Sequence, residues 1–238
     1  MEPPANQGIS LLGERLARLR ARIVAAERRA CRPEGGVLLV AVVKQVSDEL
    51  AAAAVDAGLV ELAENRVQSL LARPPDLRAR ARFHLIGPLQ TNKARKAVAA
   101  MAEFHALDRL ELVPLLEREA AALGRVLPAW VQVNVAREPQ KHGCAPESAA
   151  ELAAASAAAP HLALRGLMTI APLADDPEAA RLSFKALREL SRDLTRRGAL
   201  PPAAKGLSMG MSSDFEMAIE EGATVVRVGS ALFGEGAA

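Results

Sequence analysis

The sequence predicts an α/β protein with a (β/α)8 barrel of the TIM type, and three observations support this fold class. The segment Val37–Lys44 is an almost unbroken apolar run, as expected for a strand buried on both faces of a parallel sheet. About eight strand-like segments alternate with helical segments over about 200 residues. No strand-like segment is followed by the Gly-x-Gly-x-x-Gly turn of dinucleotide-binding proteins, which argues against the main alternative, an open doubly wound sheet.

The first expected element is a long helix from about Ser10 to Ala30. Its apolar residues recur at helical spacing, and arginines occupy the other faces. These apolar residues are Leu12, Leu16, Leu19 and Ile23. A basic amphipathic helix can bind a membrane or RNA. The commoner arrangement packs one face on a core and leaves the other faces in solvent, and we expect that arrangement here.

Strands and helices alternate after this first helix. We expect strands at Val37–Lys44, Leu59–Leu62, Arg82–Ile86, Glu103–Leu107, Ala129–Val135, Leu162–Met168, Gly206–Met209 and Thr224–Val228. We expect helices at Asp48–Ala57, Asn65–Ala72, Asn92–Met101, Leu110–Leu123, Ser148–Ala158, Glu178–Arg197 and Asp214–Glu221. No linker or second domain is evident, so we expect a single domain over residues 1–238, with the barrel at about 37–234.

Composition limits the class of function. Half of the 238 residues are apolar, and a net charge of +2 does not indicate a nucleic-acid partner. Two cysteines, Cys31 and Cys144, are too few for a disulfide framework. No apolar stretch approaches the ~20 residues of a membrane span, and the first residues lack the pattern of a signal peptide. We therefore expect a soluble cytoplasmic protein without a membrane partner.

Chemistry in such barrels lies at the carboxyl ends of the strands. Lys44 ends the first strand, and an amine desolvated there has a lowered pKa and becomes capable of Schiff-base chemistry. The alternative is a lysine whose side chain snorkels from the strand end to solvent. Polar residues, glycines and methionines follow the other strands. They are Glu64, Asn65, His84, Gly87, Asp108, Asn134, Met168, Ser208, Met209, Arg227 and Gly229. We expect a shared ligand pocket at these positions.

The last two strand–loop units indicate a phosphate site. Ser213 and Glu216 have the spacing of a capping box, so we expect a helix to begin there. Ser212 and the free N–H groups of that helix would then face the pocket. Gly229 allows close approach of the backbone, and Ser230 adds a hydroxyl. Loops after strands seven and eight form the recurring phosphate site of these barrels.

An amine and a phosphate site across one barrel mouth fit two ligands, a sugar phosphate held as a Schiff base or pyridoxal 5′-phosphate. Arg227 on the final strand cannot accept a proton. Beside a pyridine nitrogen it would donate a hydrogen bond and keep the ring unprotonated, which disfavours quinonoid chemistry.

Other residues give weaker signals. The four histidines, His84, His105, His142 and His161, lack metal-ligand spacing, so we expect no metal site. We expect His84 to lie in the pocket or just behind it. Cys144 lies near Lys141 and His142, which can activate a thiol, although such cysteines are more often inert. The group Lys93, Arg95 and Lys96 can attract anions near the pocket, and a solvated helix face is the commoner interpretation.

Several linked motifs resemble the pyridoxal-phosphate homeostasis protein family over most of the chain. They are Val43-Lys44, Glu64-Asn65-Arg66-Val67-Gln68, Phe83-His84-Leu85-Ile86-Gly87-Pro88-Leu89-Gln90-Thr91-Asn92-Lys93, Val133-Asn134-Val135 with Lys141-His142-Gly143, Leu164-Arg165-Gly166-Leu167-Met168, Leu207-Ser208-Met209-Gly210-Met211-Ser212 and Arg227-Val228-Gly229-Ser230-Ala231-Leu232-Phe233-Gly234. Three positions depart from the family pattern: Ala63 replaces a usual glycine, Ser213 a common acidic residue and Ser230 a usual threonine.

The resemblance implies a fold-type III barrel related to the N-terminal domain of alanine racemase, without that enzyme's extra β domain. It implies that Lys44 holds pyridoxal phosphate as a reversible internal aldimine, and that Lys141 influences cofactor release or a second binding event. Other family positions around the ring and phosphate match Asn65, Ser208, Met209, Ser212, Arg227, Gly229 and Ser230. Together with His84 and Met168 at the strand ends, these are the expected cofactor-binding residues.

The function implied by the resemblance is to carry and buffer the cofactor without clear catalytic turnover. Apo forms of pyridoxal-phosphate enzymes are possible partners, and we expect a monomer or weak dimer. An amino-acid racemase is the alternative from another class, but it needs a second acid/base such as the tyrosine of alanine racemase, and this chain contains no tyrosine. A Schiff-base aldolase, the third interpretation, needs a proton shuttle near Lys44.

Overall fold

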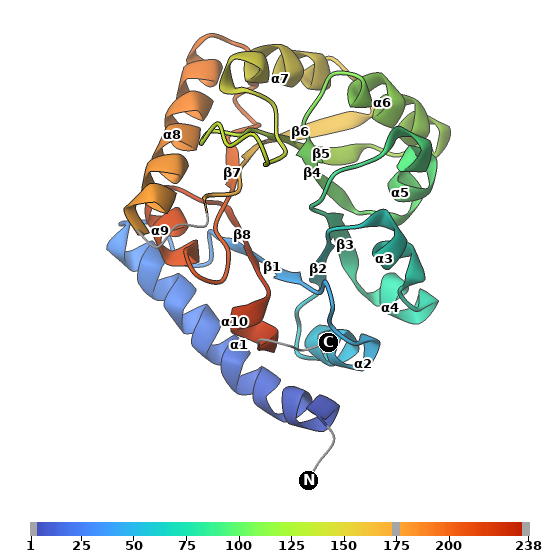
Figure 1. The fold of residues 1–238 in the computed structure, drawn as a ribbon, viewed down its shortest axis with the longest axis vertical. Helices are drawn as coiled ribbons and strands as arrows, with labels where there is room; N and C mark the ends of the chain where they lie inside the picture. Colours follow the sequence, from blue (N-terminus) through green and yellow to red (C-terminus); the bar gives the residue numbers. More distant parts are fainter. Residues whose placement is uncertain (1–3, 173–176, 235–238) are drawn as a thin grey trace.

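Eight parallel strands close into a barrel in the computed structural model, which describes residues 4–172 and 177–234. Neighbouring strands pair in sequence order, and β1 closes the barrel against β8 (Figure 1). The strands are β1 Leu38–Val42, β2 Glu61–Glu64, β3 Arg82–Leu85, β4 Glu103–Leu107, β5 Leu127–Gln132, β6 Leu162–Met168, β7 Gly206–Ser208 and β8 Val225–Val228. The predicted barrel is confirmed, and each predicted strand overlaps an observed one.

Helices surround the barrel on its outside (Figure 1). They are α1 Pro4–Arg29, α2 Asp48–Asp56, α3 Val67–Ala72, α4 Pro75–Arg80, α5 Ala94–Ala100, α6 Leu112–Ala122, α7 Ala149–Ala157, α8 Pro177–Arg196, α9 Phe215–Glu220 and α10 Ser230–Phe233, with 3-10 turns η1 Thr91–Lys93 and η2 Pro146–Ser148. Two of these helices, α4 and α10, were not predicted. Both are only one or two turns long, which is too short for a hydrophobic period to show.

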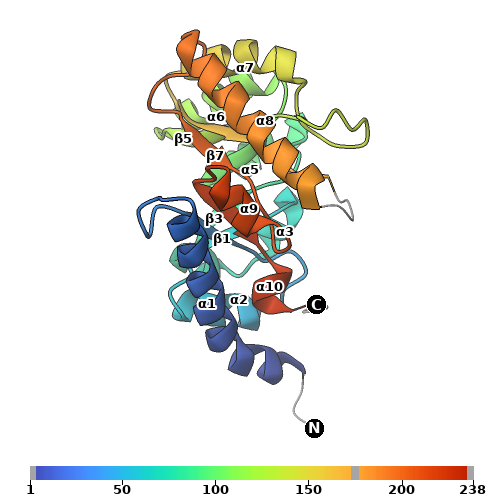
Figure 2. The same cartoon turned by 90° about the vertical axis from the view of Figure 1, so that its left-hand side faces the viewer.

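Helix α1 packs along the outside of the last barrel unit, beside α9 and α10 (Figure 2). The four apolar residues predicted to face a core are buried. Part of the basic surface is also paired, because Arg22 binds Glu216 and Arg29 binds Glu220, both on α9. Arg22 also lies over the ring of Phe215, with 4.6 Å to the centroid. Apolar packing, ion pairs and a cation–π contact therefore join α1 to α9, the helix between β7 and β8.

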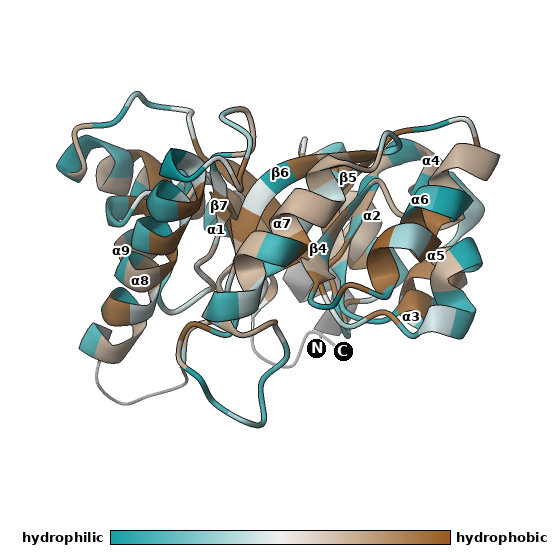
Figure 3. Cartoon of the chain, turned by 90° about the horizontal axis from the view of Figure 1, so that it is seen from above, coloured by the Kyte–Doolittle hydropathy of each residue, from teal (hydrophilic) through white to brown (hydrophobic). Residues whose placement is uncertain are grey.

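The apolar core has two parts. The larger part lies between the sheet and the helices, which are hydrophobic on one side and hydrophilic on the other (Figure 3). The smaller part lies inside the barrel and consists of Val40, Val42, Ala63, Trp130, Met168 and Val225. Among the described residues, no helix combines the length and the apolar character that crossing a membrane requires.

Candidate functional site

A cavity of about 590 Å³ opens at the carboxyl ends of the strands. This volume is within the range of small-molecule and cofactor sites. Seven of the residues predicted to bind or release a ligand line it: Lys44, Asn65, Lys141, Ser212, Arg227, Gly229 and Ser230. They come from strand β8 and from loops far apart in the sequence, and the closure of the barrel brings them together. No aspartate or glutamate is among the described residues that line this cavity.

Lys44 lies in the short loop after β1, which ends two residues before it. The residue is exposed, as in the alternative of a lysine whose side chain reaches solvent from the strand end. The next residue, Gln45, has a left-handed backbone with φ of 61°, which turns the chain sharply toward α2. Lys44 therefore stands on a tight turn at the cavity mouth, where both a ligand and water can reach it.

Arg73 holds this turn in place, and sequence reasoning missed it. Its guanidinium donates to the carbonyl oxygens of Val43 (2.5 Å) and Val46 (2.8 Å), which flank the Lys44 turn. It also donates from Nε and Nη2 to Oε1 of the buried Glu64 (2.9 and 2.7 Å) and from Nη1 to Asp48 (2.7 Å). The available signal was Glu64 itself, because a carboxylate at the end of a buried strand requires a cation.

The loop after β7 is joined to the loop after β8 through Ser212. Its Oγ accepts hydrogen bonds from the backbone N–H groups of Gly229 and Ala231, both at 3.2 Å. Within the described chain, the backbone N–H groups of Ser212, Ser213 and Ser230 have no protein acceptor. Three cavity-lining residues with free N–H groups form a cradle suited to an anion such as a phosphate.

The predicted capping box of Ser213 and Glu216 is wrong. Helix α9 begins at Phe215 after the cap residue Asp214, whose Oδ1 accepts from the N–H of Met211 at 2.5 Å. Asp214 therefore closes the loop before the helix, and its side chain makes no capping hydrogen bond to α9. Glu216 is unavailable for a capping box because its carboxylate binds Arg22 on α1.

Gly229 lies where the end of β8 passes close to β1. A Cβ at this position would lie 3.2 Å from the carbonyl oxygen of Val42 and 3.4 Å from its Cβ. A larger side chain would crowd this approach, and the N–H of Gly229 would move away from Ser212. Glycine is therefore matched to the narrow gap beside the cradle.

Arg227 is a buried cation that lines the cavity. Nη1 donates to Ser208 Oγ (2.7 Å) and Nη2 to the carbonyl oxygen of Thr169 (2.8 Å). Burial lowers the pKa of Arg227 to about 10, against the opposing effect of the Asp214 charge, so the guanidinium stays protonated at neutral pH. Among the described residues it forms no salt bridge. A buried cation without a carboxylate partner suits a ligand acceptor in the cavity.

A buried polar chain continues from Ser208 through the barrel interior. Ser208 Oγ lies 3.0 Å from Nδ1 of His105, whose Nε2 lies 3.4 Å from Glu103. His84 lies between Glu103 (3.2 Å) and Glu61 (2.6 Å). Burial lowers the pKa of His105 to about 4, so it is neutral at pH 7 and accepts at Nδ1 from Ser208 when its proton is on Nε2. Burial lowers the pKa of His84, but its two carboxylate partners outweigh this and the net shift is upward.

Four predicted cofactor residues do not line the cavity. His84 and Ser208 belong to the buried polar chain, and Met168 packs in the apolar cluster inside the barrel. Met209 faces the opposite way, into the core between sheet and helices. The atoms of His84, Glu103 and His105 that could bind a metal lie within 4.8 Å of one another, and the two histidines hydrogen-bond directly at 2.9 Å.

Lys141 lines the cavity but is held by its own loop. Its Nζ donates to the carbonyl oxygen of Ala171 (2.8 Å) and pairs with Glu138 (2.5 Å). Nearby Cys144 is not activated by Lys141 and His142. Burial raises the pKa of its thiol to about 12, helped by the charge of Asp108, which favours the inert interpretation.

Comparison with known proteins agrees with this geometry. Residues 15–236 match the family model of the alanine racemase N-terminal domain. The chain is 40% identical over 223 residues to a pyridoxal phosphate homeostasis protein of Aquifex aeolicus, covering 93% of this chain and 97% of that protein. A protein of the same name from Pseudomonas aeruginosa is 39% identical over 227 residues, 95% of this chain and 96% of that protein.

Solved structures extend the comparison. PipY of Synechococcus elongatus, solved with pyridoxal phosphate bound, is 34% identical with a TM-score of 0.82, covering 94% of this chain and all of that one. An alanine racemase of Clostridium difficile shares the fold at 16% identity and a TM-score of 0.69, where the match covers 90% of this chain and 55% of the enzyme. The chain therefore belongs to the alanine racemase N-terminal domain family and to the pyridoxal phosphate homeostasis proteins.

Proposed function

We propose that this protein binds pyridoxal 5′-phosphate in the cavity at the strand ends, and that it carries and buffers the cofactor. One observation supports this most directly. Among the residues that the structure describes, the cavity joins a primary amine, a buried arginine with no carboxylate partner and a cradle of free N–H groups, and no carboxylate lines it. The residues present thus match the aldehyde, ring nitrogen and phosphate of this cofactor. The PipY structure with the same cofactor bound supports the assignment.

The proposed roles follow from the position of each group. Pyridoxal phosphate supplies an aldehyde that condenses reversibly with a primary amine, and Lys44 is the amine at the cavity mouth. The N–H groups of Ser212, Ser213 and Ser230 bind the phosphate, and Ser212 fixes the two loops that carry them. Asn65, which also lines the cavity, borders the ring.

Arg227 argues for a carrier rather than a catalyst. Its orientation is fixed by Ser208 and Thr169, and a guanidinium cannot accept a proton, so it would donate to the ring nitrogen and leave it unprotonated. An unprotonated ring is a weak electron sink. The chain contains no tyrosine to act as a second acid/base, so nothing favours the racemase alternative.

Release is the other half of the proposed function. Lys44 is exposed, so water would have access to a linkage formed there, and its hydrolysis would return the free amine and the aldehyde. Lys141 lies on the opposite loop, and we assign it an influence on release through its pairing with Glu138. Apo forms of pyridoxal-phosphate enzymes are the proposed recipients, the cytoplasm is the proposed location, and a monomer or weak dimer is the proposed state.

The test is loading with the cofactor. The loaded protein is expected to be yellow, and borohydride should bleach the visible band and leave one cofactor per chain by mass. Lys44→Ala should abolish both signals, whereas Lys185→Ala, an exposed lysine of α8, should keep them. A wild-type protein that takes up no cofactor would refute the proposal. Carriage is tested separately, by asking whether loaded protein activates an apo-enzyme faster than free release allows.

A further inference from the structure

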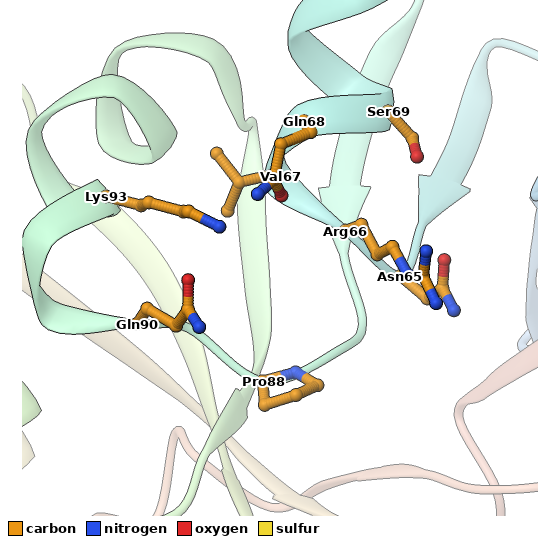
Figure 4. A pocket seen from close by; sticks show the side chains of 8 residues that line it. All are labelled: Asn65, Arg66, Val67, Gln68, Ser69, Pro88, Gln90 and Lys93. Carbon is orange, nitrogen blue, oxygen red and sulfur yellow. The ribbon is translucent and has the colours of Figure 1, made fainter.

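A second hollow of about 630 Å³ lies directly beside the cofactor cavity (Figure 4). Residues after β2 and β3 line it, including Arg66, Gln68, Gln90 and Lys93. Asn65 and Pro88 line both hollows, so the two share a wall. The proposed cofactor site uses only the first hollow. The second one has the size of a small-molecule site and is not explained by cofactor binding.

The shared wall is rigid. A Cβ on Gly87 would lie 2.0 Å from the carbonyl oxygen of Asn65, so the two loops meet backbone to backbone. The N–H of Ile86 donates to the carbonyl oxygen of Glu64 at 2.9 Å, which joins the same two strand ends. Neither loop has room to move into the other. The second hollow therefore keeps a constant position relative to the cofactor cavity.

The charges of this hollow are unbalanced. Among the described residues, neither Arg66 nor Lys93 forms an ion pair or a side-chain hydrogen bond, and no aspartate or glutamate lines the hollow. This differs from the arginines on the outer helices, such as Arg22 and Arg181, whose guanidinium groups bind carboxylates. Two free cations around a hollow without an acidic residue create a positive potential that attracts anions.

Polar side chains line the hollow from two sides. Figure 4 shows Lys93 and Gln90 pointing into the space from one side, whereas Arg66 extends away from Lys93 and its guanidinium lies beside Asn65 on the other. The side-chain amides of Gln68 and Gln90 form no hydrogen bond within the described residues. Two cations and two amides without side-chain partners among the described residues thus line one hollow. A planar guanidinium fork with an ammonium is a combination that binds phosphate or carboxylate oxygens.

We propose that this hollow is a second binding site, which takes a phosphate or carboxylate group of a small molecule next to the cofactor cavity. Arg66 and Lys93 bind the oxyanion, and Gln68 and Gln90 orient the remaining polar atoms. The site stands on its own residues and does not require Lys44. Its proximity across the Asn65–Pro88 wall lets the second ligand lie beside a bound cofactor.

The experiment is a titration of the ¹⁵N-labelled full chain, followed by amide chemical shifts at constant ionic strength. One arm uses inorganic phosphate and the other uses succinate. The cofactor cradle reports through Ser212 and Ser230, and the proposed site reports through Gln68 and Gln90. We expect saturable shifts at the second pair in at least one arm. The arm that produces them identifies the anion as phosphate or carboxylate.

Variants locate the effect. The double variant Arg66→Gln/Lys93→Gln should weaken binding at the second pair at least tenfold and leave the cradle response unchanged. Lys96→Gln removes one exposed charge from the same region without touching the hollow, and should behave as wild type. The proposal fails if neither anion shifts the second pair, or if the double variant titrates like wild type. Those outcomes leave the cofactor proposal intact, since it is tested by loading at Lys44.

Discussion

Replacing Arg73 with methionine should destabilise the protein and loosen the Lys44 turn at the same time. The substitution keeps the length and apolar stem of the side chain but removes the guanidinium. Arg73 donates to two carbonyls beside Lys44 and to the carboxylates of Glu64 and Asp48. The side chain of Glu64 is only 1% exposed, whereas that of Asp48 is 46% exposed. The consequences of the two broken ion pairs should therefore differ.

The magnitude follows from this difference in burial. Leaving a buried carboxylate without its cation costs about 3–5 kcal/mol. The exposed partner Asp48 contributes about 0–1 kcal/mol, since such pairs are screened by solvent. We expect Arg73→Met to lower the free energy of unfolding by about 4 kcal/mol in total. The freed carbonyls of Val43 and Val46 should also let the turn fluctuate, and cofactor affinity should fall with it.

Urea denaturation and cofactor titration measure the two effects. The double variant Arg73→Met/Glu64→Gln removes the buried charge as well. It should recover about half of the lost stability, because an unpaired buried amide destabilises the fold less than an unpaired carboxylate does. Asp48→Asn serves as the control with a loss of no more than about 1 kcal/mol. The reasoning is refuted if Arg73→Met costs under about 1 kcal/mol, or if the double variant is no more stable than the single one.

Two further predictions concern the barrel interior and the cradle. Because burial holds the pKa of His105 at about 4 instead of 6.5, the unfolded chain takes up a proton as pH falls through 6.5 while the folded chain does not. Unfolding free energy should thus drop by about 3 kcal/mol between pH 6.5 and 4. The raised pKa of His84 changes the unfolding free energy only above pH 6.5, outside this window. Urea denaturation midpoints measured at several pH values should show the drop, and His105→Gln should flatten it. Ser212→Ala should cost about 1–2 kcal/mol and weaken cofactor binding about tenfold, since two N–H groups lose their acceptor. The exposed Ser213→Ala should stay within about 0.5 kcal/mol of wild type, and equal cofactor affinities in the two variants would contradict the role of Ser212.

The strands were predictable because their signal is local. Buried parallel strands are short apolar runs, and their order around a barrel follows the order in the sequence. The carboxyl ends of the strands were therefore known to converge, and Lys44, Ser212, Arg227 and Ser230 do line one cavity. Closure of the barrel therefore brings residues that are far apart in the sequence into one site.

The direction of individual side chains was less accessible. Neighbouring strand residues point to opposite faces, so Ser208 and Met209 could not both face the barrel interior, and the structure turns Ser208 inward. Which of the two residues faces inward depends on the register of β7 with its neighbouring strands, and the sequence alone does not determine that register. Arg73 was out of reach for a different reason, because it acts on carbonyls 27 and 30 residues earlier in the chain.

The buried polar chain explains why several predicted residues lie beneath the cavity. Barrel interiors are normally filled by apolar side chains, and a buried arginine is costly unless its donors are satisfied. Here Ser208 and the Thr169 carbonyl accept from two donors of Arg227. His105 in turn contacts Ser208 through Nδ1 and Glu103 through Nε2. The guanidinium is therefore aimed before any ligand arrives. A fixed donor selects a ligand acceptor and rejects a ligand donor, so in the proposed site Arg227 would hold the ring nitrogen unprotonated. Ser208 and His84, which the sequence assigned to cofactor contact, thus act through Arg227. In the proposed site, the unprotonated state of the cofactor ring would follow from this chain in the barrel interior.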